Sequence, residues 1–166
     1  AAAFDHVYLP LLHRRGFVAP NVADVRLAGH SAGGYVLEPQ AGLHEHVALF
    51  DFRSLYPSII QTFKIDPLSR ICRDTNPLET PEGYRFSRTD HILPAHIERL
   101  LALRATAKQQ NNAHLSQAIK ILMNSFYGVM GSGGCRFYHK DLPSAITTTG
   151  HWVLQTAMAF LESMNY

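Results

Sequence analysis

The second half of the sequence carries cationic and polar side chains at helical spacing. Lys120, Asn124 and Tyr127 fall within about 60° of each other on a helix of 3.6 residues per turn, so an ammonium, an amide and a phenol lie in a row. Arg104 and Lys108 are one turn apart in the preceding segment, and both side chains bind phosphate oxygens. The pattern predicts a site for a phosphate-bearing ligand; the alternative for Arg104 and Lys108 is a pair of exposed bases near a helix C-terminus.

The local charge favours an anionic partner. The chain of 166 residues has a formal net charge of +2, but between His91 and Lys140 six bases stand against one acid. A basic segment in a near-neutral chain is typical of phosphate binding. A solvated helix face would give the same composition.

The stretch "VALFDFRSLYPSII" at 47–60 places a carboxylate where an apolar, strand-like run ends. Asp51 closes that run, a turn follows, and Tyr56 comes just beyond it. A strand end is a rigid place for a ligand carboxylate, but the residue types alone also fit a turn or helix-cap acid and a core tyrosine.

The elements that would position these residues form an α+β fold. Residues 1–30 and 64–92 are predicted to have little regular structure, because proline and glycine interrupt them. The predicted elements are a strand hairpin over 33–52, a short helix at 57–63 and longer helices at 94–110, 114–127 and 143–164. The helix pair is expected to be an insertion, and the last helix to pack on the sheet.

Two predictions concern the core. The packing face of helix 114–127 is predicted from its apolar spacing, with the members Leu115, Ala118, Ile119, Leu122 and Phe126. Trp152 and the apolar residues of the last helix are also expected to be buried.

The composition indicates a globular protein. Hydrophobic residues make up 46% and charged residues 17%. No apolar run approaches the roughly 20 residues needed to cross a bilayer, and no membrane partner is expected. Cys72 and Cys135 form no disulfide framework, so a reducing cytoplasm is the expected location.

Two motifs together resemble a known family. "DFRSLYPSII" at 51–60 and "KILMNSFYG" at 120–128 resemble the first and second conserved motifs of the family B DNA polymerases, in the expected order. The flanks "AGGYV", "LPAHIERLLALRATAKQQ" and "CRFYHKDLPSAIT" are most similar to a bacterial member. The resemblance implies template-directed addition of dNTPs to a primer 3′ end on the bacterial nucleoid. It also implies primer–template DNA and, for the full-length protein, a sliding clamp as partners.

The resemblance implies a partial polymerase palm with an inserted fingers domain. The implied parts are a lead-in segment at 1–32, a first palm part at 33–62, the fingers at 63–125 and a second palm part at 126–166.

The resemblance implies two Mg²⁺ ions and assigns their ligands. Asp51 and the main-chain carbonyl of Phe52 are the implied metal ligands, and Asp51 and Lys120 the implied catalytic residues. Carboxylate oxygen, phosphate oxygen and water are what Mg²⁺ prefers. The N–H groups near Ser54 and Leu55, where a turn becomes a helix, are the implied cradle for phosphate.

Other implied roles concern the nucleotide and the DNA. The ring of Tyr56 would lie under the sugar and exclude ribonucleotides, and Arg104 and Lys108 would join Lys120 on the triphosphate. Asn124 would support the nucleotide pocket. The implied DNA contacts are Tyr127 and Gly128 near the nascent base pair, and Gly33, Gly34 and Tyr35 on the template backbone.

Two features depart from the family pattern. The family often has an arginine before the glycine that matches Gly150, where this chain has Thr149. The third motif, with its acid pair, is expected a few residues after Tyr166, so we expect the sequence to be a fragment that is inactive alone. The alternative is an inactivated relative that only binds DNA; the acid pair would distinguish the two.

Two weaker patterns are set aside. "GSGGC" follows a helix and lacks the Gly-Lys-Ser/Thr of a P-loop, so it is predicted to end the helix. "HEH" at 44–46 lacks further ligands at zinc spacing, and exposed strand histidines are the simpler interpretation.

Overall fold

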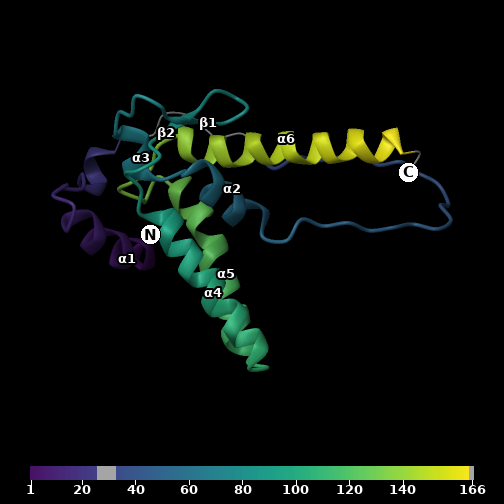
Figure 1. The fold of residues 1–166 in the computed structure, drawn as a ribbon, viewed down its shortest axis with the longest axis horizontal. Coiled ribbons are helices and arrows are strands. Elements are labelled where there is room, and N and C mark those ends of the chain that lie inside the picture. Colours follow the sequence, from purple (N-terminus) through teal and green to yellow (C-terminus); the bar gives the residue numbers. More distant parts are fainter. Residues whose placement is uncertain (26–32, 165–166) are drawn as a thin grey trace.

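The computed structural model describes residues 1–25 and 33–164, and this part of the chain is mostly helical (Figure 1). Its elements, in chain order, are α1 (Ala2–His13), the 3₁₀ turn η1 (Val22–Asp24), α2 (Leu55–Phe63), α3 (Pro67–Ile71), β1 (Leu78–Glu79), β2 (Arg85–Phe86), α4 (Leu93–Gln109), α5 (Ala113–Met130) and α6 (Asp141–Ser163). The four predicted helices are confirmed as α2, α4, α5 and α6, with ends that differ by at most three residues. Within the described residues, no helix is both long enough and apolar enough to cross a membrane.

Helices α4 and α5 form a hairpin that projects from the body of the molecule (Figure 1). The predicted break between them lies at 110–112, where the Asn112 side chain accepts a hydrogen bond from the Leu115 backbone N–H at 3.0 Å and so caps α5. The buried residues of α5 are Ser116, Ile119, Met123, Phe126 and Met130. The predicted packing face is therefore wrong at Leu115, which is 45% exposed, and at Ala118, which is also exposed.

Helix α6 is buried only in its first half. From Leu142 to Gly150 it packs mainly against α2 and α5, not on a sheet. Its second half projects away from the body (Figure 1), and Trp152 and Phe160 are 47% and 62% exposed. The prediction that Trp152 belongs to the core is wrong, because the buried residues of α6 end at Gly150 and the Trp152 side chain is not enclosed by its neighbours.

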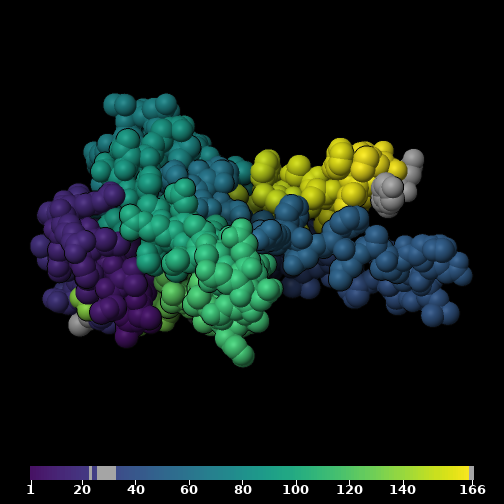
Figure 2. Space-filling model, turned by 60° about the horizontal axis from the view of Figure 1, so that its bottom comes forward, coloured from purple at the N-terminus to yellow at the C-terminus, as the bar shows by residue number. Residues whose placement is uncertain are grey.

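The predicted strand hairpin at 33–52 is absent. This segment has no regular secondary structure and leaves the body on the side to which α6 projects (Figures 1 and 2). Val47, Leu49 and Phe50, apolar residues of the predicted strand, are 76%, 94% and 71% exposed. A strand is stable only when its backbone pairs and one face is covered, and no described residues do either here.

The strands lie instead in the 64–92 region that was predicted to be irregular. β1 and β2 pair antiparallel, with Leu78 opposite Phe86 and Glu79 opposite Arg85. The turn between them contains Gly83 at φ 84°, a conformation that glycine adopts without strain. The α+β prediction is thus confirmed only in the coarse form of a mostly helical chain with one two-stranded sheet.

Helix α1 was also not predicted, although its signal is present in the sequence. Phe4, Tyr8 and Leu12 recur every four residues and are all buried. Phe4 stacks on Tyr8 with ring centroids 5.1 Å apart and meets Phe126 of α5 edge-on at 5.7 Å. Residues 26–30 of the predicted irregular segment lie outside the described residues.

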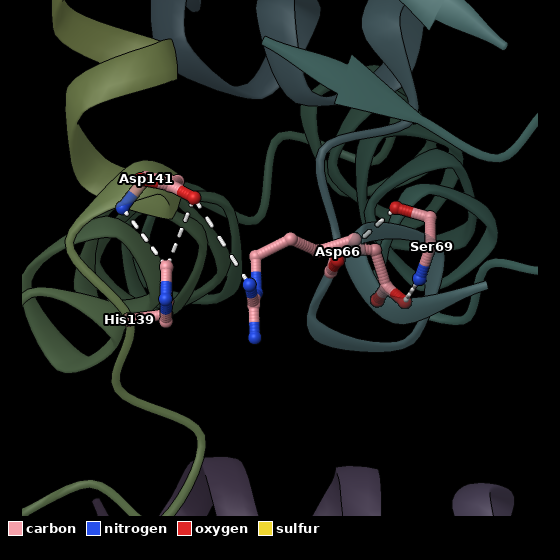
Figure 3. Close-up of polar contacts among 5 residues, drawn as sticks. Asp66, Ser69, His139 and Asp141 are labelled. Carbon is pink, nitrogen blue, oxygen red and sulfur yellow. Dashed lines mark hydrogen bonds and ion pairs between the residues drawn. The ribbon is translucent and has the colours of Figure 1, made fainter. Parts of the chain in front are cut away.

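Asp66 joins three helices in the interior. Its fully buried carboxylate accepts a hydrogen bond from the Tyr8 hydroxyl of α1 at 2.8 Å. It also accepts hydrogen bonds from the backbone N–H groups of Leu68 and Ser69 at the start of α3. A fourth donor is the backbone N–H of Leu93 at the start of α4, at 2.8 Å. Figure 3 shows the contacts with Ser69, and nearby the ion pair of His139 with Asp141 at 3.2 Å. Burial raises the pKa of the Asp66 carboxyl, and the four donors oppose that rise.

We predict that Tyr8→Phe destabilises the chain by about 1–3 kcal/mol, because it removes a donor from a buried carboxylate without changing the packing. The free energy of unfolding in urea measures the loss. Tyr84→Phe is the matched control, since the half-buried Tyr84 hydroxyl has no hydrogen bond within the described residues. Equal stability of the Tyr8→Phe variant and the parent chain would contradict the role assigned to Asp66.

A second buried polar group lies at the base of the hairpin. The His96 ring is 5.9 Å from that of Phe126, and its Nε2 is buried without a partner within the described residues. Burial, followed by the charge of Arg99, lowers the pKa of His96. The folded chain therefore resists protonation that the unfolded chain accepts near the ordinary histidine pKa of about 6.5.

We predict that the stability of the chain is full above about pH 6.5 and falls as the pH drops from there toward the lower pKa of the folded state. Burial also lowers the pKa of His91 and His139, which act in the same direction. His96→Leu should reduce the slope of unfolding free energy against pH between 5 and 7, whereas His6→Gln, at an exposed position of α1, should not. An unchanged slope in His96→Leu would remove His96 from this effect.

Candidate active site

The first turn of α2 presents backbone N–H groups. Ser54 is the N-cap in a left-handed conformation, φ 57° and ψ 45°, and its side chain makes no capping hydrogen bond. The first N–H groups of any helix lack a partner within the helix and concentrate the positive end of its dipole. Leu55 and Tyr56 therefore offer donors at the point where the chain leaves Asp51.

Cations from α4 and α5 lie opposite this turn. Arg104 and Lys108 come from α4, and Lys120 comes from α5. None of the three has an ion-pair partner among residues 1–25 and 33–164. The Nε of Arg104 is buried and makes no hydrogen bond within the same residues, so it is available to an acceptor outside them, such as water or a bound anion.

These groups line one open cleft of about 590 Å³. Its lining residues are Asp51, Phe52, Arg53, Ser54, Leu55, Tyr56, Pro57, Arg104, Lys108, Lys120, Met123, Asn124 and Tyr127. Four of these side chains are cationic and one is anionic, a balance that attracts a polyanion. The size is that of a small-molecule site.

Two tyrosines on the cleft wall contact each other. The rings of Tyr56 and Tyr127 have centroids 4.8 Å apart and are tilted by 48°. Burial, together with the neighbouring Tyr56, raises the pKa of Tyr127, so its phenol stays protonated and can donate a hydrogen bond at neutral pH.

The cleft brings together every residue that the sequence predicted to bind metal or nucleotide. Sequence reasoning did not single out Arg53 or Met123, which also line it. Arg53 lies inside the "DFRSLYPSII" motif, so its charge was a visible signal, whereas Met123 had none.

The predicted DNA contacts lie elsewhere, apart from Tyr127. Gly33 and Gly34 are exposed with open space around them, and Gly128 is an exposed position of α5. Tyr35 is 38% exposed, and its ring lies 5.3 Å from that of His151 in α6.

The protein ligands for a metal ion are few. Within the described residues, no group of three or more histidine, cysteine, aspartate or glutamate side chains could hold an ion. Asp51 is the single carboxylate on the cleft, and its side chain is exposed. This donor set fits Mg²⁺ in the mode that uses one or two carboxylates together with substrate phosphates, not an all-protein cage.

Comparison with known proteins identifies the family. The profile described as DNA polymerase family B matches residues 4–166. The chain belongs to this family. The predicted resemblance is therefore confirmed.

Similar proteins include a bacterial and an archaeal DNA polymerase. The chain is 44% identical over 170 residues to DNA polymerase II of Escherichia coli (strain K12), which covers 99% of this chain and 22% of that protein. It is 35% identical over 176 residues to a DNA polymerase of Archaeoglobus fulgidus, covering 98% of this chain and 22% of the relative. This chain thus spans about a fifth of the length of these relatives.

A solved family B structure has the same fold over most of the chain. The family B DNA polymerase from the archaeon Pyrobaculum calidifontis matches with a TM-score of 0.72 and 26% identity, covering 93% of this chain and 23% of that one.

Proposed function

We propose that this chain is the nucleotide-binding part of a DNA-dependent DNA polymerase that adds deoxynucleotides to a primer 3′ end. The observation that supports this most is the single cleft that combines Asp51, the free first turn of α2 and three unpaired cations. Residues 63–125, with the α4–α5 hairpin, correspond in this proposal to the fingers. Residues 1–32 correspond to the lead-in segment, and residues 33–62 and 126–166 correspond to the two parts of the palm. The protein would work on DNA in the cytoplasm of a bacterium, with a sliding clamp as a further partner.

The cations bind the triphosphate in this proposal. Arg104 presents a planar fork and Lys108 and Lys120 present point charges, so together they hold phosphate oxygens and neutralise charge that develops during transfer. The N–H groups of Leu55 and Tyr56 add donors for the same oxygens. Within the part of the chain that the structure describes, none of these cations forms an ion pair with an acid, which supports this role.

Asp51 and the carbonyl of Phe52 would hold Mg²⁺. When bound, the metal lowers the pKa of the primer hydroxyl and stabilises charge on the phosphates. Asp51 lies three residues before the turn at Ser54 and lines the same cleft, so its carboxylate is close to the phosphate donors of α2. The proposal includes two ions in the complete enzyme.

The remaining cleft residues would select the nucleotide and contact the DNA. The Tyr56 ring would exclude a 2′-hydroxyl by its shape, because it projects from the same turn that holds the phosphates. Asn124 and Tyr127 lie on the α5 wall of the cleft and would support the base pair. Gly128 next to them, and Gly33, Gly34 and Tyr35 on the extended segment, are the proposed DNA contacts.

The first test concerns the metal ligand. In the complete polymerase, Asp51→Ala should reduce single-turnover nucleotide addition by about a thousandfold, the equivalent of several kcal/mol of charge stabilisation. Primer–template affinity should stay within about twofold, because Asp51 does not contact DNA in this proposal. Glu82→Ala, which removes an exposed acid in the β1–β2 turn, is the control. Near-parental extension by Asp51→Ala would exclude Asp51 from the metal site.

The second test concerns the sugar. Tyr56→Ala should raise the ratio of ribonucleotide to deoxyribonucleotide kcat/KM by about a hundredfold, because the ring no longer occupies the space of a 2′-hydroxyl. Tyr56→Phe is the matched control, since it keeps the ring and should keep the discrimination. Unchanged discrimination in Tyr56→Ala would refute the role of the ring.

A further inference from the structure

Helix α6 packs against two cleft-lining residues, Leu55 and Tyr56, at a glycine. Gly150 is buried in α6, and a Cβ atom at this position would lie 3.4 Å from Cε1 of Tyr56, 3.7 Å from Cδ1 of Ile59 and 3.7 Å from Cδ2 of Leu55. A methyl group would thus be in contact with three side chains of α2. Anything larger would occupy space that these side chains already fill.

The backbone conformation does not explain why this residue is a glycine. Gly150 lies inside a regular helix and not in the left-handed region, where glycine would be favoured. A glycine inside a helix destabilises it by roughly 0.5–1 kcal/mol relative to alanine. The space beside Tyr56 admits a methyl group but nothing larger, so the packing limits the size of the residue at this position.

Packing alone holds the Tyr56 ring in place. Its hydroxyl makes no hydrogen bond within the described residues. The ring contacts Tyr127 within the cleft wall and lies against α6 at Gly150. The size of residue 150 therefore decides how far the ring stands into the cleft.

We propose that Gly150 is a positioning residue that sets the depth of the Tyr56 ring and thereby the fit of the incoming nucleotide. This inference rests on the proposed role of Tyr56 in nucleotide binding. A larger side chain at position 150 pushes the ring into the cleft. The ring then obstructs the sugar without touching the groups that bind phosphate or metal.

The test uses single-nucleotide addition by the complete polymerase. Gly150→Val should raise the KM for dNTPs by about tenfold and change kcat by less than about threefold, the pattern of an obstructed binding site. Gly150→Ala should raise the KM by less than about threefold, because a methyl group just fits. Ala159→Val, a β-branched substitution at an exposed position of the same helix, should leave both constants unchanged.

A double substitution separates displacement of the ring from damage to the helix. In the Tyr56→Ala background the ring is absent, so adding Gly150→Val should raise the KM by less than about twofold. A tenfold KM increase that persists in this background would overturn the inference. So would a KM for Gly150→Val equal to that of the parent enzyme.

Two further controls complete the design. If Gly150→Val does not fold, Gly150→Ser takes its place, with an expected KM increase of about threefold that disappears with Tyr56→Ala. The Tyr56→Ala enzyme alone reports on the proposed function. Unchanged sugar discrimination there refutes the role of Tyr56, whereas altered discrimination without coupling to position 150 refutes only the role of Gly150.

Discussion

A single buried carboxylate determines how the helices of this chain meet. Asp66 receives donors from α1, from the start of α3 and from the start of α4, and it is completely excluded from solvent. A buried charge is tolerated only when its hydrogen bonds are satisfied, so the three helices cannot shift independently without leaving it unpaired. The direction of α4 is thereby tied to the body of the molecule. Arg104 and Lys108 lie more than two turns further along α4, so their positions also depend on the contact of Asp66 with the start of this helix.

The cleft follows from this arrangement and from the contact of α2 with α6. One wall consists of the α4–α5 hairpin with its cations, and the other is the first turn of α2 with Asp51 next to it. The two walls come from segments about fifty residues apart in the sequence, and Asp66 lies between them in the chain. The residues that line the cleft and the buried residues that position them are therefore parts of one packed unit. The hydrogen bonds of Asp66 and the packing at Gly150 therefore both affect the geometry of the cleft.

The sequence was most informative where periodicity and motif agreed. The helical spacing of Lys120, Asn124 and Tyr127 correctly predicted that they share one wall of the cleft. The extended run ending at Asp51 was misjudged, because alternation of apolar residues reports a tendency to pair but not whether a partner strand is at hand. Asp66 was overlooked although Asp-Pro is a common start of a helix, since nothing local reveals that its second oxygen serves another helix. Contacts of this kind depend on tertiary packing.

The unpaired cations of the cleft have a consequence for the empty protein. Like charges that line a common cleft repel each other, and the single carboxylate of Asp51 offsets only part of that repulsion among the described residues, so salt screens the rest. A polyanion that enters the cleft relieves this repulsion and so stabilises the folded hairpin in proportion to its affinity. Occupancy of the cleft and stability of the α4–α5 hairpin are then linked, so a tighter-binding polyanion raises the stability of the hairpin more.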